Sequence, residues 1–187
     1  MKSKSLKTPL RYPGGKSRAC TKIESYFPDL TGYKEYREPF LGGGSVALYV
    51  TQKFPHLKVW VSDLYEPLIN FWQVLQKEGN TLSNALIKLK NKYPDQENAR
   101  RLFLDTKDMI NDEHYADIDR AIAFYIVNKC SFSGLTESSS SSSSTLKSRL
   151  IPTSGTSSPS ADPCGINFNV ISKIPLFRDQ PTTSSQG

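Results

Sequence analysis

The chain has 187 residues, of which 37% are hydrophobic and 22% are charged, and it carries a formal net charge of +6. That length suits one domain, or slightly more, with a substantial core. The three cysteines lie far apart and form no Cys-X-X-Cys pair, which argues against a disulfide framework or a structural zinc site. No stretch approaches the roughly 18 apolar residues of a membrane span. Composition therefore excludes a secreted mini-protein, a membrane protein and a fibrous repeat, and it predicts a cytoplasmic chain without membrane contact.

Positive charge gathers in the first 27 residues, which hold seven Lys or Arg and a single acid, Glu24. A basic end on a protein attracts polyanions, nucleic acid first. An equally good interpretation is a solvated face that keeps the protein soluble. Charge alone does not separate the two.

The stretch from residue 6 to 82 alternates predicted strands with predicted helices. Residues 33–40 read as a strand that leads into a glycine loop, and residues 45–54 have the apolar spacing of a helix. Residues 57–61, rich in β-branched and aromatic side chains, predict a second strand, and residues 67–75 predict a second helix with a proline in its first turn. This order is typical of a βαβ unit and predicts an α/β fold with a parallel sheet.

Two further stretches have different characters. Residues 83–137 predict a mostly helical region, in which the apolar segment 119–130 is buried. Residues 138–187 contain 15 serines in 50 residues, beginning with seven in a row, and few apolar side chains to offset the entropy of ordering. This composition predicts a tail that is either disordered or the product of a disruption after about residue 137, and it is interrupted by one apolar island at residues 166–177.

The glycine loop Gly42-Gly43-Gly44 stands between a predicted strand and a predicted helix. Glycine lets the backbone approach a ligand closely, and the free N–H groups at the following helix start suit an acidic group. A glycine run by itself is more often only a turn. Asp63, at the end of the next strand, makes the glycine loop a more specific signal for a nucleotide site. A carboxylate at this spacing can accept hydrogen bonds from both hydroxyls of a ribose. The alternative role for Asp63 is to cap the following helix.

A second motif, Tyr12-Pro13-Gly14-Gly15-Lys16-Ser17, contains the Gly-Lys-Ser of phosphate-binding P-loops. A P-loop also needs a glycine five residues before Gly15, where the sequence has Leu10, and a preceding strand, which is not predicted. The motif therefore predicts a turn that presents a lysine beside an aromatic ring. That pair suits a ligand that carries both a carboxylate and a flat base.

Together with Ser62-Asp63 and Asn70, and in this order, the two motifs resemble those of the Dam-type (D12 class) DNA adenine-N6 methyltransferases. The resemblance covers roughly residues 6–135. It implies a Rossmann-like fold that binds S-adenosylmethionine, with residues 6–82 as the cofactor-binding part and residues 83–137 as a helical target-recognition insertion. It also implies that Asp63 binds the ribose of the cofactor. The other cofactor contacts of the family match Tyr12, Lys16, Phe40, Gly42 and Gly44.

The resemblance further implies contacts to double-stranded DNA. Residues 121–135 are similar to a family segment that lies close to bound DNA, and its motif positions match Asn128, Lys129, Phe132 and Gly134. An equally good interpretation of this segment is a buried helix that ends at a glycine cap. The protein is expected to be a monomer, and a cognate restriction enzyme is a candidate partner.

The sequence departs from the family pattern at the catalytic motif. The family's Asp-Pro-Pro-Tyr, which holds the amino group and the ring of the target adenine, does not occur among the 187 residues. The nearest string is Asp162-Pro163, which lacks the aromatic residue and stands in the serine-rich tail. We therefore read Asp162 as a loop residue, although it is the one candidate for a catalytic carboxylate. The chain is interpreted as the N-terminal, truncated portion of such an enzyme with an incomplete fold, either active or decayed.

Two other classes of protein stay open. One is a non-catalytic protein that uses this half-fold to bind DNA or the cofactor. The other is an NAD-dependent Rossmann oxidoreductase, which wants Gly-X-Gly-X-X-Gly but here has Ala47 at the third glycine position. Lys16 would have no role in that fold.

Overall fold

A computed structural model describes residues 7–93, 95–131 and 136 of the chain. The elements follow in the order helix, strand, helix, strand and then three α-helices with a short 3₁₀ helix among them. Several expectations fall outside the described residues: the disordered tail, the island at 166–177, Phe132, Gly134 and Asp162.

The described residues form a small parallel sheet of two strands. Strand β1 (Glu35–Glu38) pairs with β2 (Lys58–Val61) in the register Glu35↔Lys58 to Glu38↔Val61. Helix α2 (Ser45–Lys53) makes the crossover between them. Parallel strands that are neighbours in a sheet need such a crossover. The predicted order of strand, glycine loop, helix and strand is confirmed. The result is the mixed helix and parallel sheet of an α/β protein.

Helix α3 (Glu66–Lys92) is much longer than the helix predicted at residues 67–75. Pro67 stands in its first turn, as expected, and the backbone leaves helical geometry only at Glu78, where φ is −132° and ψ is 31°. The polar run around this kink hid the fact that the predicted helix and the helical stretch after residue 82 form one helix, in which Leu82 is buried. The predicted domain boundary between residues 82 and 83 therefore falls within one helix, and the division into domains stays a prediction.

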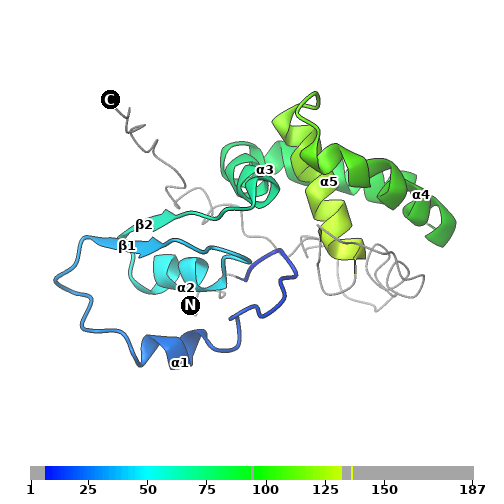
Figure 1. Cartoon of the computed structure of the whole chain (residues 1–187). Helices are drawn as coiled ribbons and strands as arrows, with labels where there is room; N and C mark the ends of the chain where they lie inside the picture. The colour runs from blue at the N-terminus through cyan, green and yellow to red at the C-terminus, as the bar shows by residue number, and fades with distance from the viewer. Residues whose placement is uncertain (1–6, 94, 132–135, 137–187) are drawn as a thin grey trace, which may run out of the picture.

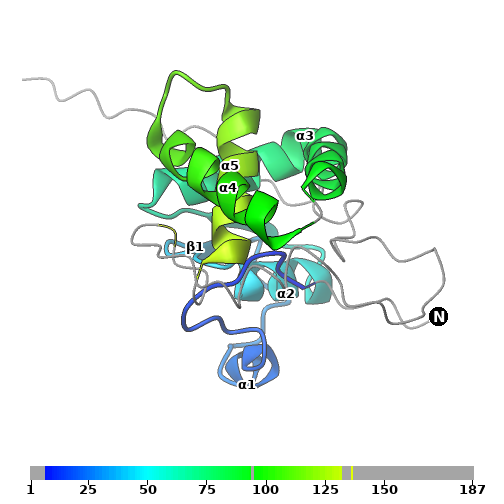
Figure 2. The same cartoon turned by 90° about the vertical axis from the view of Figure 1, so that its right-hand side faces the viewer.

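Three helices follow one another in the region predicted to be mostly helical. Helix α4 (Gln96–Lys107) begins at Asp95, whose carboxylate accepts the N–H of Asn98 at 2.9 Å. The 3₁₀ helix η1 (Asp108–Asn111) leads to α5 (Asp117–Cys130), which packs against α3 and α4. Helices α3, α4 and α5 gather on one side of the sheet, and α2 lies on the other side with the short α1 (Cys20–Glu24) beyond it (Figures 1 and 2).

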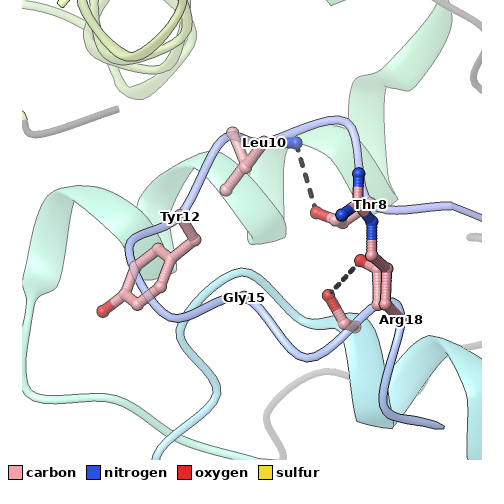
Figure 3. A pocket seen from close by; sticks show the side chains of 7 residues that line it. Thr8, Leu10, Tyr12, Gly15 and Arg18 are labelled. Atoms are coloured by element: carbon pink, nitrogen blue, oxygen red, sulfur yellow. Dashed lines mark hydrogen bonds between the residues drawn. The ribbon is translucent and has the colours of Figure 1, made fainter. Parts of the chain in front are cut away.

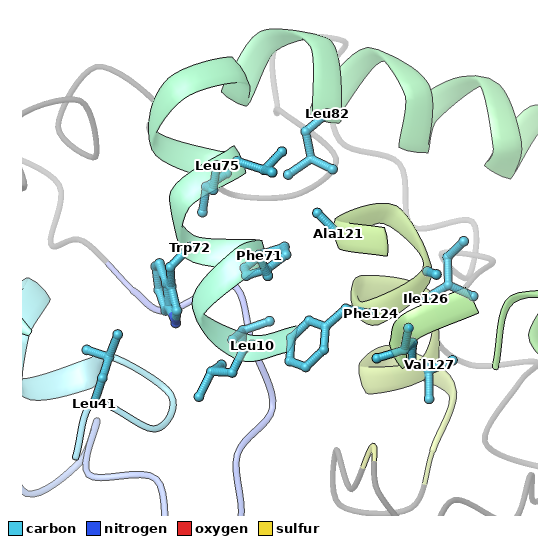
Figure 4. Close-up of a cluster of buried hydrophobic side chains, with 14 of the residues drawn as sticks. Leu10, Leu41, Phe71, Trp72, Leu75, Leu82, Ala121, Phe124, Ile126 and Val127 are labelled. Atoms are coloured by element: carbon cyan, nitrogen blue, oxygen red, sulfur yellow. The ribbon is translucent and has the colours of Figure 1, made fainter. Parts of the chain in front are cut away.

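The largest buried side chains come from α3, α4 and α5. Phe71 and Trp72 are at most 1% exposed, and the Phe71 ring lies 5.5 Å from the ring of Phe124, centroid to centroid (Figure 4). Leu10, from the irregular N-terminal segment, belongs to the same buried cluster. Across the described ranges, no helix is both long and apolar enough to span a membrane.

Candidate ligand site at the glycine loop

The N-terminal motif forms the predicted turn. The N–H of Gly15 donates to the carbonyl of Tyr12 at 3.0 Å, and Gly14 adopts a positive φ of 69°, which a residue with a side chain rarely does. The ammonium of Lys16 donates to the carbonyl of Gly14 at 2.7 Å, so the lysine folds back over its own turn. Tyr12 is 41% exposed. The turn thus presents an aromatic ring and a cation at the surface.

The glycine loop is packed against two aromatic side chains. A Cβ atom added to Gly43 would lie 2.8 Å from Cβ of Tyr12, and one added to Gly44 would lie 2.7 Å from Cζ2 of Trp72. Gly42 and Gly44 also have positive φ values of 50° and 68°. Glycine is therefore required here for close packing and for backbone conformation. The sequence predicted close approach of a ligand, whereas the structure shows close approach of Tyr12 and Trp72.

Asp63 holds the glycine loop in place. One carboxylate oxygen accepts the N–H of Gly42 at 2.8 Å, and the other accepts the N–H of Tyr65 at 3.1 Å. The N-cap residue of α3 is Tyr65, so Asp63 lies two residues before the N-cap position and its carboxylate accepts the N–H of that residue at the start of the helix. A carboxylate has about four acceptor positions, which leaves capacity for further donors such as sugar hydroxyls.

Two apolar side chains stand exposed at the same end of the sheet. Phe40 follows β1 and is 76% exposed, and Leu64 follows Asp63 and is 93% exposed. Ligands of open α/β sheets bind outside the carboxyl ends of the strands, which is where both residues lie. The sequence analysis included Phe40 and missed Leu64, although its position directly after a strand-end carboxylate was a usable signal.

A cavity of about 360 Å³ opens between the N-terminal turn and the start of α2 (Figure 3). That volume lies within the range of small-molecule sites. Ser17 and Ser45 join its two walls, with their hydroxyl oxygens 2.8 Å apart. Ser17 stood in a motif recognised from the sequence, but no ligand contact was predicted for it, for Ser45 or for Arg18. The lining residues are Thr8, Leu10, Tyr12, Gly15, Ser17, Arg18 and Ser45.

One carboxyl group near the glycine loop has a raised pKa. Burial raises the pKa of Glu38 to about 7, although the Tyr36 hydroxyl and the N–H of Ala47, near the start of α2, hydrogen-bond to it and act in the opposite direction. The Tyr36 hydroxyl donates at 3.3 Å. In the described part of the chain, no group of three His, Cys, Asp or Glu side chains is placed to hold a metal ion.

The residues matched to DNA contacts lie at the end of α5. Asn128 is only 1% exposed, and its side chain bonds to the backbone of Arg11 in both directions. Lys129 is half-buried, with its ammonium 5.2 Å from the ring centre of Tyr125. The alternative interpretation of a buried helix fits these residues, except that the helix ends at Ser131 and not at a glycine. Contacts of Asn128 and Lys129 to DNA stay a prediction.

Comparison with known proteins identifies the class to which this fold and site belong. The sequence model of the D12 class N6 adenine-specific DNA methyltransferases matches residues 12–153, which is most of the chain. The match includes the N-terminal turn, the glycine loop, Asp63 and α5. The chain therefore belongs to this family of DNA adenine methyltransferases.

Two relatives extend this result. The chain is 29% identical over 137 residues to the type II methyltransferase M.MjaIII of Methanocaldococcus jannaschii, a match that covers 70% of this chain and 47% of that protein. It is 31% identical over 126 residues to the DNA N-6-adenine-methyltransferase of Escherichia phage P1, covering 67% of this chain and 15% of the phage protein. The chain thus spans about half of the first relative and a smaller share of the second.

Proposed function

We propose that the chain binds S-adenosylmethionine at its glycine loop, as the cofactor-binding portion of an enzyme that methylates adenine N6 in DNA. One observation carries the proposal. The Tyr12 ring packs on Gly42 and Gly43 while Asp63 holds the N–H of Gly42, all at the carboxyl ends of parallel strands, in a member of the D12 family. A carboxylate that holds the glycine loop, an aromatic ring packed on that loop and a cation in the adjacent turn suit a nucleoside that also carries an amino acid.

The donor and acceptor groups at this end of the sheet fit the parts of the cofactor. Asp63 has acceptor positions for the ribose hydroxyls beyond those used by the backbone. Tyr12 and Phe40 offer apolar faces, Leu64 is exposed at the same end of the sheet, and Lys16 offers a cation for the carboxylate. Gly42 and Gly44 shape the loop along the methionine part. When bound, the cofactor supplies a methyl group on a sulfonium, which is already activated, so the protein's task is chiefly to bind and orient it.

The finer features of the fold and the partners belong to the same proposal. We infer a Rossmann-like fold of which this chain holds an incomplete, N-terminal portion. The target is double-stranded DNA, from which the adenine must be turned out of the stack. The chain acts as a cytoplasmic monomer, and a cognate restriction enzyme is a candidate partner. The similarity to M.MjaIII, a type II methyltransferase, supports that last inference.

Calorimetric titration with S-adenosylmethionine and with NAD tests the proposed ligand. We expect binding of S-adenosylmethionine and none of NAD.

Substitution Asp63→Ala should weaken the binding of S-adenosylmethionine by roughly tenfold or more. This is the scale of a lost hydrogen bond to a charged group, about 1.5–3 kcal/mol. Asp29→Ala is the matched control. Asp29 accepts the N–H of Thr31, two residues further on, just as Asp63 accepts the N–H of Tyr65, but Asp29 lies in an exposed loop. Binding of NAD alone would overturn the proposal, and unchanged affinity in Asp63→Ala would overturn the ribose assignment.

A second assay addresses catalysis. Transfer of a labelled methyl group from S-adenosylmethionine to unmethylated genomic DNA should not occur with this chain by itself, because its sequence contains no Asp-Pro-Pro-Tyr. Labelled N6-methyladenine would contradict that expectation and would make Asp162 the first residue to substitute. Binding of cofactor without transfer would favour a cofactor-binding portion over a complete enzyme.

A further inference from the structure

We propose that Asn128 is a positioning residue for the cofactor site, acting through the backbone of Arg11 rather than by contact with DNA. The inference rests on the proposed function, because the site it serves is the one assigned above to S-adenosylmethionine. The side-chain carbonyl of Asn128 accepts the N–H of Arg11 at 2.9 Å, and its amide nitrogen donates to the carbonyl of Arg11 at 2.8 Å. The asparagine amide thus bonds to one residue as a neighbouring strand would.

This pair of bonds is placed where the N-terminal segment needs it. Residues 7–19 have neither helix nor strand, so no regular hydrogen-bond ladder fixes their position. Leu10 is buried in the core beside α3 and α5 (Figure 4), and the next residue, Arg11, is held by Asn128. Arg11 also donates through its guanidinium to the carbonyl of Ser131 at 3.0 Å. The end of α5 therefore anchors the chain immediately before Tyr12.

The anchored segment delivers Tyr12 to the glycine loop. Tyr12 directly follows Arg11, and its Cβ and ring occupy the space that side chains on Gly43 and Gly42 would need. A shift of the Arg11 backbone would move Tyr12 off the loop, because only one peptide unit separates them. The side chain of Asn128 is itself 1% exposed, which leaves it little surface for a base or a phosphate. Its burial and its two bonds to Arg11 favour positioning over DNA contact.

Asn70 provides a matched control at the other end of α5. It is also a buried asparagine, 5% exposed, and its amide donates to the carbonyl of Asp117 at 2.9 Å, which ties α3 to the start of α5. That bond does not involve the N-terminal segment. Asn128→Leu and Asn70→Leu therefore each remove a buried amide of the same size, but only the first removes the bonds to the backbone of Arg11.

The test combines hydrogen exchange with cofactor binding, both measured well below the unfolding temperature of the weaker variant. In Asn128→Leu, amides of residues 10–16 should exchange at least tenfold faster than in the wild type, while those of α2 keep their rates. The dissociation constant for S-adenosylmethionine should rise about tenfold, because the free segment must be ordered on binding. Asn70→Leu should change neither quantity, even if its unfolding temperature falls as far.

Each outcome decides one point. Equal loss of cofactor affinity in both variants would mean a general structural role and would overturn the proposal. Weaker DNA binding with unchanged cofactor affinity in Asn128→Leu would establish the DNA contact instead. If Asn128→Leu does not fold, the wild type still decides: the Arg11 amide should exchange as slowly as amides within α5, and rapid exchange would refute the anchor. The wild type could fail to bind S-adenosylmethionine while the Arg11 amide still exchanges slowly. That result would refute the proposed function but not the anchor.

Discussion

Glu38 shows how a single side chain links the sheet to the glycine loop. It stands at the end of β1, and a hydrogen bond from the N–H of Ala47 connects it to α2 across the loop. Burial raises its pKa from 4.5 to about 7, with the Tyr36 hydroxyl and the Cys20 thiol as its titratable neighbours. The native state therefore binds more protons than the unfolded state between about pH 4.5 and 7. In that window the free energy of unfolding falls as pH rises.

Substitution Glu38→Gln should remove this pH dependence. Because glutamine carries no charge at any pH, the free energy of unfolding at pH 8 should rise by about 1–3 kcal/mol relative to the wild type, on the scale of 1.4 kcal/mol per pKa unit. At pH 4 the two proteins should differ little. Urea denaturation across this range measures the effect. Glu35→Gln is the control, since Arg37 lowers the pKa of that carboxyl, and a gain in Glu35→Gln at pH 8 would point to net charge instead.

Gly43 offers a second test at the scale of one residue. An added methyl group would lie 2.8 Å from Cβ of Tyr12, an atom that cannot rotate out of the way. Gly43→Ala should therefore displace Tyr12, weaken binding of S-adenosylmethionine at least tenfold and lower stability by about 1–3 kcal/mol. Gly32→Ala, where nothing lies within 4 Å of the added atom, should change neither. Titration with S-adenosylmethionine and thermal melting of both variants measure the affinity and the stability. Normal affinity in Gly43→Ala would refute the packing argument.

At the scale of elements, a buried arginine joins three helices. The side chain of Arg120 on α5 is only 8% exposed. It donates to the carboxylate of Glu66 at the start of α3 and to the carbonyl of Ile110 in η1, the latter at 3.2 Å. The ion pair has one well-solvated member, because Glu66 is 60% exposed. The contribution of Arg120 therefore comes chiefly from its hydrogen bond to the buried carbonyl and from its packing.

Arg120→Met should lower the free energy of unfolding by about 1–3 kcal/mol, since the apolar chain fills the space but leaves the carbonyl of Ile110 without its donor. Arg101→Met, at an exposed position of α4, should stay within about 0.5 kcal/mol of the wild type. Urea denaturation provides both numbers. Equal effects in the two variants would mean that the loss follows from charge alone.

Helices and strands were predicted correctly from the sequence where the pattern that marks them is local. The ends of both strands and of α2 lie within two residues of their predicted positions, because apolar periodicity and the glycine loop mark them. The five-residue α1 escaped notice because so short a helix carries almost no periodic pattern. The stretch from residue 82 onward was predicted to be helical, but its continuity with the helix at residues 67–75 was missed, because a polar stretch around the kink resembles a helix end.

The whole molecule depends on contacts that local patterns do not reveal. Asn128 and Arg11 are 117 residues apart, and nothing in either neighbourhood predicts their pairing. The glycines, Tyr12 and Asp63 were found from motif order, but the hydrogen bond from Gly42 to Asp63 was not. Resemblance to a family supplies the residues of a site, while the second layer that orients them becomes visible only in three dimensions. Asn128 is the clearest example, since its motif position suggested DNA and its surroundings indicate an anchor.

The central claim is that the N-terminal turn and the glycine loop together form the site for S-adenosylmethionine. Ultraviolet cross-linking of methyl-labelled S-adenosylmethionine to the full chain, followed by tryptic peptide mapping, tests it most directly. We predict label on the peptides that span residues 12–16 and 38–53, and its disappearance when excess unlabelled cofactor is present. Label confined to residues 95–131, or label that the excess does not displace, would contradict the claim.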